Sequence, residues 1–126
     1  MLKDAKFAPI LCTTQPERAR TFYVEKLGLE FVRKEQRALV LRGDGRYLRL
    51  QVVDVMPSGF GAAFGWQVDD IEAKVEALAK RGVEVERYDG LPQDSKGIAR
   101  FANGDRVAWF LDPDGNVLSL AELVPV

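Results

Sequence analysis

A chain of 126 residues is the usual length of one domain, and 47% hydrophobic with 29% charged residues is ordinary for a globular protein. The net charge of −1 argues against nucleic acid or an anionic membrane as partner, and no apolar run approaches the roughly 20 residues of a membrane span. A single cysteine excludes an intrachain disulfide framework and predicts a cytoplasmic protein, while the lack of histidine removes the commonest metal ligand and general base.

The first half of the chain is predicted to contain a strand, a helix and three strands. A strand is expected over Phe7–Thr13, where Pro9 indicates a strand start or a sheet edge. Thr14 and Glu17 match a capping box, which predicts a helix that ends at Gly28. The further predicted strands are Leu29–Val32, Ala38–Leu41 and Tyr47–Val53.

After a linker rich in glycine and proline, the same order starts again. Ala62–Val68 is a predicted strand, Asp69 and Glu72 form a second capping box, and Gly82 ends the helix. Val83–Val85 begins the next predicted strand. The last predicted elements are the short apolar stretch Ile98–Phe101 and a hairpin of Val107–Leu111 and Val117–Leu120 around the turn Asp112–Asn116.

The doubled pattern predicts an α+β fold with two tandem βαβββ modules, about 5–54 and about 61–124, in a single domain that spans 1–126. Leu27–Phe31 and Arg81–Val85 take the same place in the two halves. Each module would carry a helix on one face of its sheet. We expect the faces without helices to form a curved mixed sheet around a bowl-shaped cavity.

Three stretches resemble the vicinal oxygen chelate superfamily, which includes glyoxalase I, bleomycin-resistance proteins and extradiol dioxygenases. These stretches are Arg18–Tyr23 with Leu27–Leu29, then Val68–Ala73, then Phe110–Asn116, in the order that the family has them. The resemblance implies a single glyoxalase/bleomycin-resistance-like domain with paired βαβββ modules around a bowl-shaped site. It also implies a homodimer.

Enzymes of this family hold a divalent metal by side chains on the first and last strands of each module. The resemblance places Ala8, Ala63 and Ser119 at three of these positions, and either Arg49 or Gln51 at the fourth. None of them supplies the carboxylate, imidazole or thiolate that first-row divalent cations prefer. We therefore predict no metal ligands, no catalytic metal and no cofactor. This departure argues against the lyase, isomerase and dioxygenase chemistry of the family.

Strand alternation assigns a set of polar and aromatic side chains to the bowl. Arg49 suits a carboxylate or phosphate, or else its head reaches solvent or pairs with an acidic neighbour. Trp109 stacks on a planar ligand or belongs to the core. The side-chain amides of Gln51 and Gln67 and the hydroxyl of Ser119 either form hydrogen bonds with a ligand or line a solvent-filled groove. The candidate ligand-binding residues are Arg49, Gln51, Gln67, Trp109 and Ser119.

Two other features receive a structural interpretation. Without a histidine to activate it, Cys12 is expected to be an inert thiol, so no catalytic residue is assigned. The segment Asp112–Asn116 superficially resembles a calcium loop, but its glycine comes too early and Leu123 takes the place of the closing glutamate. We interpret it as a turn.

Three functions remain open at this point. The first is a small-molecule-binding protein without a catalytic metal, acting in ligand sequestration or resistance. The second is a lyase, isomerase or dioxygenase of the same superfamily, either metal-free or with an unrecognised metal site. The third is a protein–protein module. The assigned strands carry one fixed positive charge, on Arg49, and no opposing carboxylate, so the expected partner is a small anionic molecule.

Overall fold

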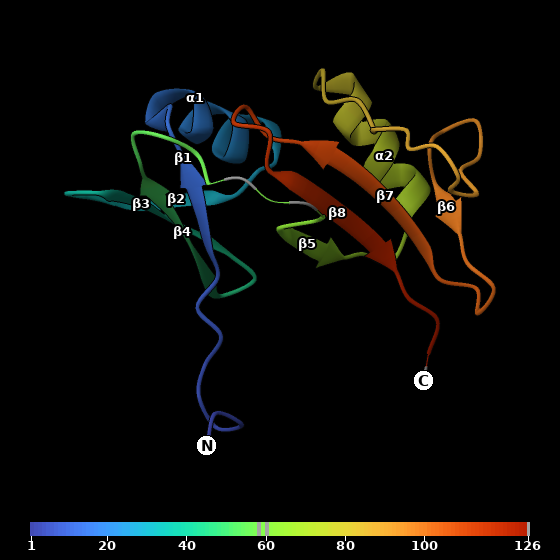
Figure 1. The fold of residues 1–126 in the computed structure, drawn as a ribbon, viewed down its shortest axis with the longest axis horizontal. Helices are drawn as coiled ribbons and strands as arrows, with labels where there is room; N and C mark the ends of the chain where they lie inside the picture. The colour runs from blue at the N-terminus through green and yellow to red at the C-terminus, as the bar shows by residue number, and fades with distance from the viewer. Residues whose placement is uncertain (58, 60, 126) are drawn as a thin grey trace. The chain divides into compact units, whose positions relative to one another are not determined.

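The computed structural model describes residues 1–57, 59 and 61–125. The chain divides into two compact units, Met1–Ser58 and Gly59–Val126, and each is built from one sheet and its own helical segment (Figure 1). Within the described residues, no helix combines the length and the apolar character that crossing a membrane would require.

The first unit is a four-stranded mixed sheet in the order β1-β4-β3-β2. β1 runs parallel to β4, and the other neighbouring strands are antiparallel. This arrangement confirms the predicted βαβββ order. The elements are β1 (Ile10–Thr13), α1 (Pro16–Arg20), η1 (Thr21–Lys26), β2 (Glu30–Glu35), β3 (Ala38–Gly43) and β4 (Arg46–Val52).

β1 begins at Ile10 rather than at Phe7, because Pro9 has no N–H to donate to a neighbouring strand. The carbonyl of Pro9 still accepts a hydrogen bond from the backbone N–H of Arg49 (3.1 Å). The N-cap of α1 is Gln15, and this helix start has no side-chain capping hydrogen bond, so the predicted capping box of Thr14 and Glu17 is wrong. Proline is tolerated at the following position, where an N–H has no partner in the helix.

The predicted first helix is α-helical only as far as Arg20 and continues as a π-helix, η1. The N–H of Leu27 donates to the carbonyl of Phe22 (3.0 Å), five residues back instead of four. Phe22 and the adjacent Tyr23 are both buried, and their rings meet edge to face at 5.3 Å. Helical spacing alone cannot separate the two kinds of helix over so short a segment.

The second unit repeats the architecture, with strand order β5-β8-β7-β6 and a parallel β5–β8 pair. Asp70 rather than Asp69 caps its helix, and its carboxylate accepts a hydrogen bond from the N–H of Ala73 (3.1 Å). The predicted strand at Val83–Val85 is wrong, since Val85 forms only an isolated bridge with Phe110. The elements are β5 (Phe64–Gln67), α2 (Ile71–Lys80), β6 (Ala99–Arg100), β7 (Arg106–Leu111) and β8 (Val117–Glu122).

The turn between β7 and β8 closes on a buried carboxylate. Asp112 accepts hydrogen bonds from the N–H groups of Asp114 and Asn116 (both 2.9 Å) and from the side-chain amide of Asn116 (2.8 Å). Gly115 takes a positive φ of 84°, a conformation that a side chain would strain. Both oxygens of Asp112 are thus engaged within the turn, as the interpretation of this segment as a turn requires.

Each sheet buries one face and leaves the other partly open, as the alternation predicts. In the first unit the buried face packs against the helical segment. In the second it packs on α2, whose Ile71, Val75 and Leu78 are buried. The buried strand residues on these faces include Leu11, Leu39, Leu41, Leu48 and Leu50 in the first unit and Ala108, Phe110, Leu118 and Leu120 in the second. Ala38 and Val40 of β3 are buried as well, although they alternate onto the opposite face. We call the opposite face of each sheet its open face.

Glu122 ties the end of β8 to the start of α2. One carboxylate oxygen accepts from the N–H of Ile71 (3.1 Å), and the other accepts from two nitrogens of Arg106 (2.6 and 3.2 Å). The hydrogen bonds from Arg106, followed by that from Ile71, hold the pKa of Glu122 below its usual value of 4.5. A negative charge at a helix N-terminus also stabilises the helix.

We expect the second unit to lose stability in acid through Glu122. Because the pKa is lower in the folded state, the stabilisation is complete above pH 4.5 and disappears as the pH falls through the folded-state value. Urea denaturation between pH 7 and pH 3 should therefore show a steeper loss for wild type than for Glu122→Gln. Glu84→Gln, at an exposed position, is the control and should follow wild type. If the free energy of unfolding fell equally with pH in wild type and in Glu122→Gln, this prediction would be contradicted.

Candidate ligand-binding site

Two rows of residues cross the open face of the first sheet. The register of the strands places Ile10, Arg49, Val40 and Arg33 side by side. The next row consists of Cys12, Gln51, Ala38 and Glu35. Arg49 and Gln51 therefore lie on the same face, as predicted.

Arg49 is paired with Glu35, which reaches it from the far end of β2. An η-nitrogen of Arg49 donates to one carboxylate oxygen of Glu35, and Nε of Arg33 donates to the other (3.0 Å). The hydrogen bond from Arg33 is the main cause that lowers the pKa of Glu35, and the charge of Arg49 adds to it. Glu35 lies beyond the predicted strand Leu29–Val32 and outside the strands assigned to the bowl, so the expectation of no carboxylate did not cover it. Of the two alternatives for Arg49, the one in which it pairs with an acidic neighbour is observed.

Arg49 and Ile10 lie between two hollows of the first unit. The smaller hollow, about 410 Å³, is also lined by Glu35, Arg37 and Gln51. The larger, about 1180 Å³, lies between the N-terminal segment and the β3–β4 turn, with Tyr47 on its wall. Ile10 is 55% exposed and Tyr47 53% exposed, so apolar surface is open to a ligand beside the guanidinium.

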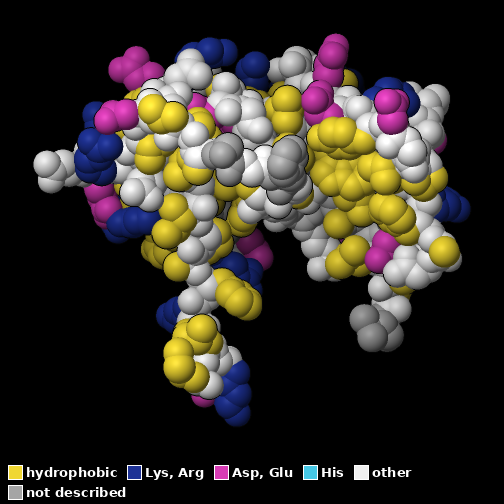
Figure 2. Space-filling view, in the orientation of Figure 1, with side chains coloured by type: hydrophobic (Ala, Val, Ile, Leu, Met, Phe, Trp, Pro, Cys, Tyr) yellow, Lys and Arg dark blue, Asp and Glu magenta, His cyan; other side chains and the backbone are white. Residues whose placement is uncertain are grey.

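The open face of the second sheet carries the other three candidates. Ser119 lies between Gly65 and Trp109 in one row, and the next row contains Gln67 on the same face. A Cβ atom at Gly65 would lie 2.1 Å from the hydroxyl oxygen of Ser119, so the glycine provides the space that this hydroxyl occupies. In Figure 2 hydrophobic side chains gather over β7 and β8.

Trp109 is half-buried and contacts the ring of Tyr88 edge to face at 5.8 Å. Burial raises the pKa of the Tyr88 hydroxyl, with a smaller contribution from the charge of Glu86. Trp109 faces away from α2, because Ala108 and Phe110 on either side of it are buried on the helix face. Its indole is therefore available on the open face.

The five candidates thus form two sets, Arg49 with Gln51 in the first unit, and Gln67, Trp109 and Ser119 in the second. Their convergence on one bowl concerns both units together and stays a prediction. The sequence analysis missed Glu35 and Tyr88. The cluster of charges at Arg33–Glu35 was a signal for the first, since such a run is not expected on a buried face.

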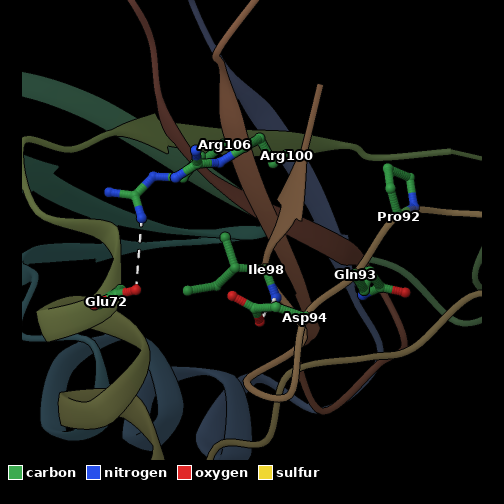
Figure 3. A pocket seen from close by; sticks show the side chains of 7 residues that line it. All are labelled: Glu72, Pro92, Gln93, Asp94, Ile98, Arg100 and Arg106. Atoms are coloured by element: carbon green, nitrogen blue, oxygen red, sulfur yellow. Dashed lines mark hydrogen bonds and ion pairs between the residues drawn. The ribbon is translucent and has the colours of Figure 1, made fainter. Parts of the chain in front are cut away.

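A further hollow of about 360 Å³ opens beside α2 (Figure 3). Arg106 extends across it toward Glu72, at 3.6 Å, and also binds Glu122. Asp94 and Ile98 lie below Arg100 and Arg106 in this view. One carboxylate oxygen of Asp94 accepts hydrogen bonds from the backbone N–H groups of Lys96 and Ile98. Arg106 is paired with two glutamates and the Asp94 carboxylate is bound by backbone N–H groups, so we interpret the hollow as a structural crevice. None of the sequence candidates lines it.

At the positions that the resemblance assigns to metal ligands, the side chains include no carboxylate, imidazole or thiolate, and the loss of the metal stays a prediction. Two are alanines, and the hydroxyl of Ser119 lies over Gly65. At the fourth position Arg49 brings a positive charge and Gln51 a neutral amide. Across residues 1–57, 59 and 61–125, no group of three or more His, Cys, Asp or Glu side chains is placed to hold an ion. Weak neutral donors beside a guanidinium do not suit a divalent cation.

Comparison with known protein families gives one match over most of the chain. The model described as "Glyoxalase/Bleomycin resistance protein/Dioxygenase superfamily" matches residues 6–120. A comparison with curated proteins gives no match.

Solved structures give similar folds over nearly the whole chain. A glyoxalase family protein from Enterococcus faecalis is 26% identical, with a TM-score of 0.75 over 97% of this chain and 100% of its own. TnmS3, an antibiotic binding protein from Streptomyces sp. CB03234, is 27% identical, with a TM-score of 0.68 over 96% and 98%. Lactoylglutathione lyase from Agrobacterium tumefaciens, 20% identical with a TM-score of 0.72 over 94% and 93%, shares the fold.

Proposed function

Because the chain belongs to the Glyoxalase/Bleomycin resistance protein/Dioxygenase superfamily, we propose that it binds a small, flat, acidic molecule without a catalytic metal. Sequestration of that molecule, or resistance to it, is the role that follows. The similarity to an antibiotic binding protein over 96% of the chain supports binding rather than turnover. The homodimer and the cytoplasmic location remain proposals. For the dimer, β1 and β5 are edge strands that a second copy would cover.

The chemistry of the open faces carries this proposal. The first sheet presents Arg49 beside exposed apolar surface, and the second presents the indole of Trp109 beside the hydroxyl of Ser119. A guanidinium recognises a carboxylate or a phosphate in a fixed fork, and an indole stacks on a flat ring. A ring that carries an acidic group would therefore offer a partner to each set: its acid to Arg49 and its flat face to Trp109.

We expect the purified protein to hold far less than one transition metal per chain, because the family's ligand positions carry Ala8, Ala63 and Ser119. Elemental analysis of protein prepared without chelators measures this directly. Stoichiometric zinc, nickel, iron or manganese that tracks with a reaction would instead favour the lyase, isomerase or dioxygenase alternative. The metal would then use ligands outside the family's positions.

A thermal-shift screen tests the charge preference of the site. Flat aromatic anions should raise the melting temperature, whereas flat aromatic cations of similar size should not. Any compound that binds the folded state alone stabilises it by mass action, about 2.7 kcal/mol at a hundredfold excess over Kd. Stabilisation by cations in preference to anions would contradict the proposal.

Tryptophan fluorescence then locates the hits of this screen. Trp109 lies on the open face, whereas Trp66 stacks on Phe110 at 6.2 Å and contacts Phe64 at 5.0 Å. A ligand that stacks on Trp109 should quench emission in wild type and in Trp66→Phe, and the quench should be absent in Trp109→Phe. If the quench followed Trp66 instead, the ligand would not bind the open face.

A further inference from the structure

The charges around Arg49 carry an inference that rests on the proposed function and concerns which anions the site admits. Arg33 and Arg49 lie in the same cross-strand row, on either side of Val40. Glu35, in the next row, spans the strand between them and binds both guanidinium groups. Val40 is 2% exposed although it lies on the face without a helix. Its neighbours therefore cover it, and the three charged side chains form part of this face.

Glu35 carries an acidic group, as the proposed ligand does. Its carboxylate engages the same guanidinium of Arg49 that an acidic ligand would use, beside the same hollow. The side chain of Arg49 is 41% exposed and that of Glu35 is 33% exposed, so water reaches the pair. An exposed ion pair contributes little to stability, and its partners can exchange. Glu35 can also keep its bond to Arg33 when its contact with Arg49 is lost.

We propose that Glu35 is a specificity-determining residue, an internal counter-ion that the acidic group of a ligand displaces from Arg49. With Arg33 and Arg49 against one carboxylate, the three groups carry a net charge of +1, which one ligand anion would neutralise. Neutral molecules cannot displace Glu35 and gain nothing from Arg49. Cations would be repelled by the two guanidinium groups. Glu35 therefore selects molecules whose acidic group binds a guanidinium at least as well as a carboxylate does.

The test uses the fluorescent probe anilinonaphthalenesulfonate, a flat aromatic anion, and its uncharged analogue N-phenylnaphthylamine. Glu35→Gln should bind the anionic probe about twofold to fivefold more tightly than wild type, because it removes a competitor of the strength of an exposed ion pair. The affinity for the neutral analogue should not change. The gain should shrink at high ionic strength, since salt screens exposed charges.

Glu30→Gln is the matched control. Glu30 is on the same strand as Glu35 and also pairs with an arginine, Arg42, through two hydrogen bonds (2.7 and 3.0 Å). It lines neither of the two hollows beside Arg49. Its substitution removes the same charge from the same hairpin and should leave the affinity for both probes as in wild type. Melting curves for each variant confirm that the fold is retained.

The double variant Arg49→Ala/Glu35→Gln separates this inference from the proposed function. Its affinity for the anionic probe should equal that of Arg49→Ala alone, because Glu35 acts through Arg49. If Glu35→Gln binds this probe no more tightly than wild type while Arg49→Ala weakens it, the inference is wrong and the proposed site stands. If Arg49→Ala changes nothing, the proposed anion site fails and this inference fails with it.

Discussion

Replacing Arg49 with alanine is expected to weaken the binding of a flat anionic ligand about tenfold to a hundredfold. A hydrogen bond between two charged groups contributes about 1.5–3 kcal/mol, and its loss converts to an affinity change of that order. The substitution also leaves the carboxylate of Glu35 beside the hollow without this partner, so repulsion adds to the lost attraction. Isothermal titration of the best anionic hit of the thermal-shift screen measures the change.

Two further variants define the cause of the Arg49 effect. Arg42→Ala removes one positive charge from the neighbouring strand, where the side chain pairs with Glu30, and should change the affinity little at physiological salt. Arg49→Lys keeps the charge but not the planar fork and should lie between wild type and alanine. Equal losses in Arg49→Ala and Arg42→Ala would mean that only net charge matters and that Arg49 makes no direct contact.

Replacing Phe110 with alanine is expected to lower the free energy of unfolding by about 3–5 kcal/mol, the usual cost of truncating a buried phenylalanine. The ring is 1% exposed, stacks on Trp66 and lies on the face of β7 that packs against α2. Its removal therefore leaves a cavity at the centre of the second unit. Urea denaturation followed by circular dichroism measures the change.

Phe7→Ala makes the same chemical change at a residue that is 98% exposed, and it should cost less than about 0.5 kcal/mol. The difference between the two variants isolates burial from the intrinsic effect of the substitution. Comparable losses would mean that Phe7 is buried in solution, for instance against a second copy of the chain. A small loss in Phe110→Ala would contradict the core described for the second unit.

The sequence pattern predicted the architecture because strand alternation, helix ends and turn residues define each βαβββ unit locally. Alternation placed Leu48 and Leu50 in the core and Arg49 on the opposite face, and the residues around Gly115 specified the last hairpin. The predictions that were wrong concern segments for which two local backbone conformations differ little in free energy. Asp69 and Asp70 are adjacent candidates for one N-cap, and the spacing of Phe22 and Tyr23 does not distinguish a π-helix from an α-helix.

The pairing of Arg49 with Glu35 could not be predicted from alternation, because β2 contains a bulge. Phe31 pairs with Leu41, yet Arg33 pairs with Val40, so the register shifts between them. A strict period of two places Glu35 on the same face as Phe31, toward the core. The bulge turns Arg33 and Glu35 to the open face instead. One extra residue in a strand thus decides which charge meets Arg49.

The strand order of each unit has a consequence for how the protein is made on the ribosome. In both sheets the first strand pairs with the last, β1 with β4 and β5 with β8. β5 therefore leaves the exit tunnel long before its partner exists, and β8 also lies between β5 and β7. A chain that is released before Val117 contains all four strands of the first sheet. In its second unit, β5 and β7 lack β8, the strand that lies between them. Such strands are open to pairing with other chains. Premature termination late in synthesis should thus yield an aggregation-prone product.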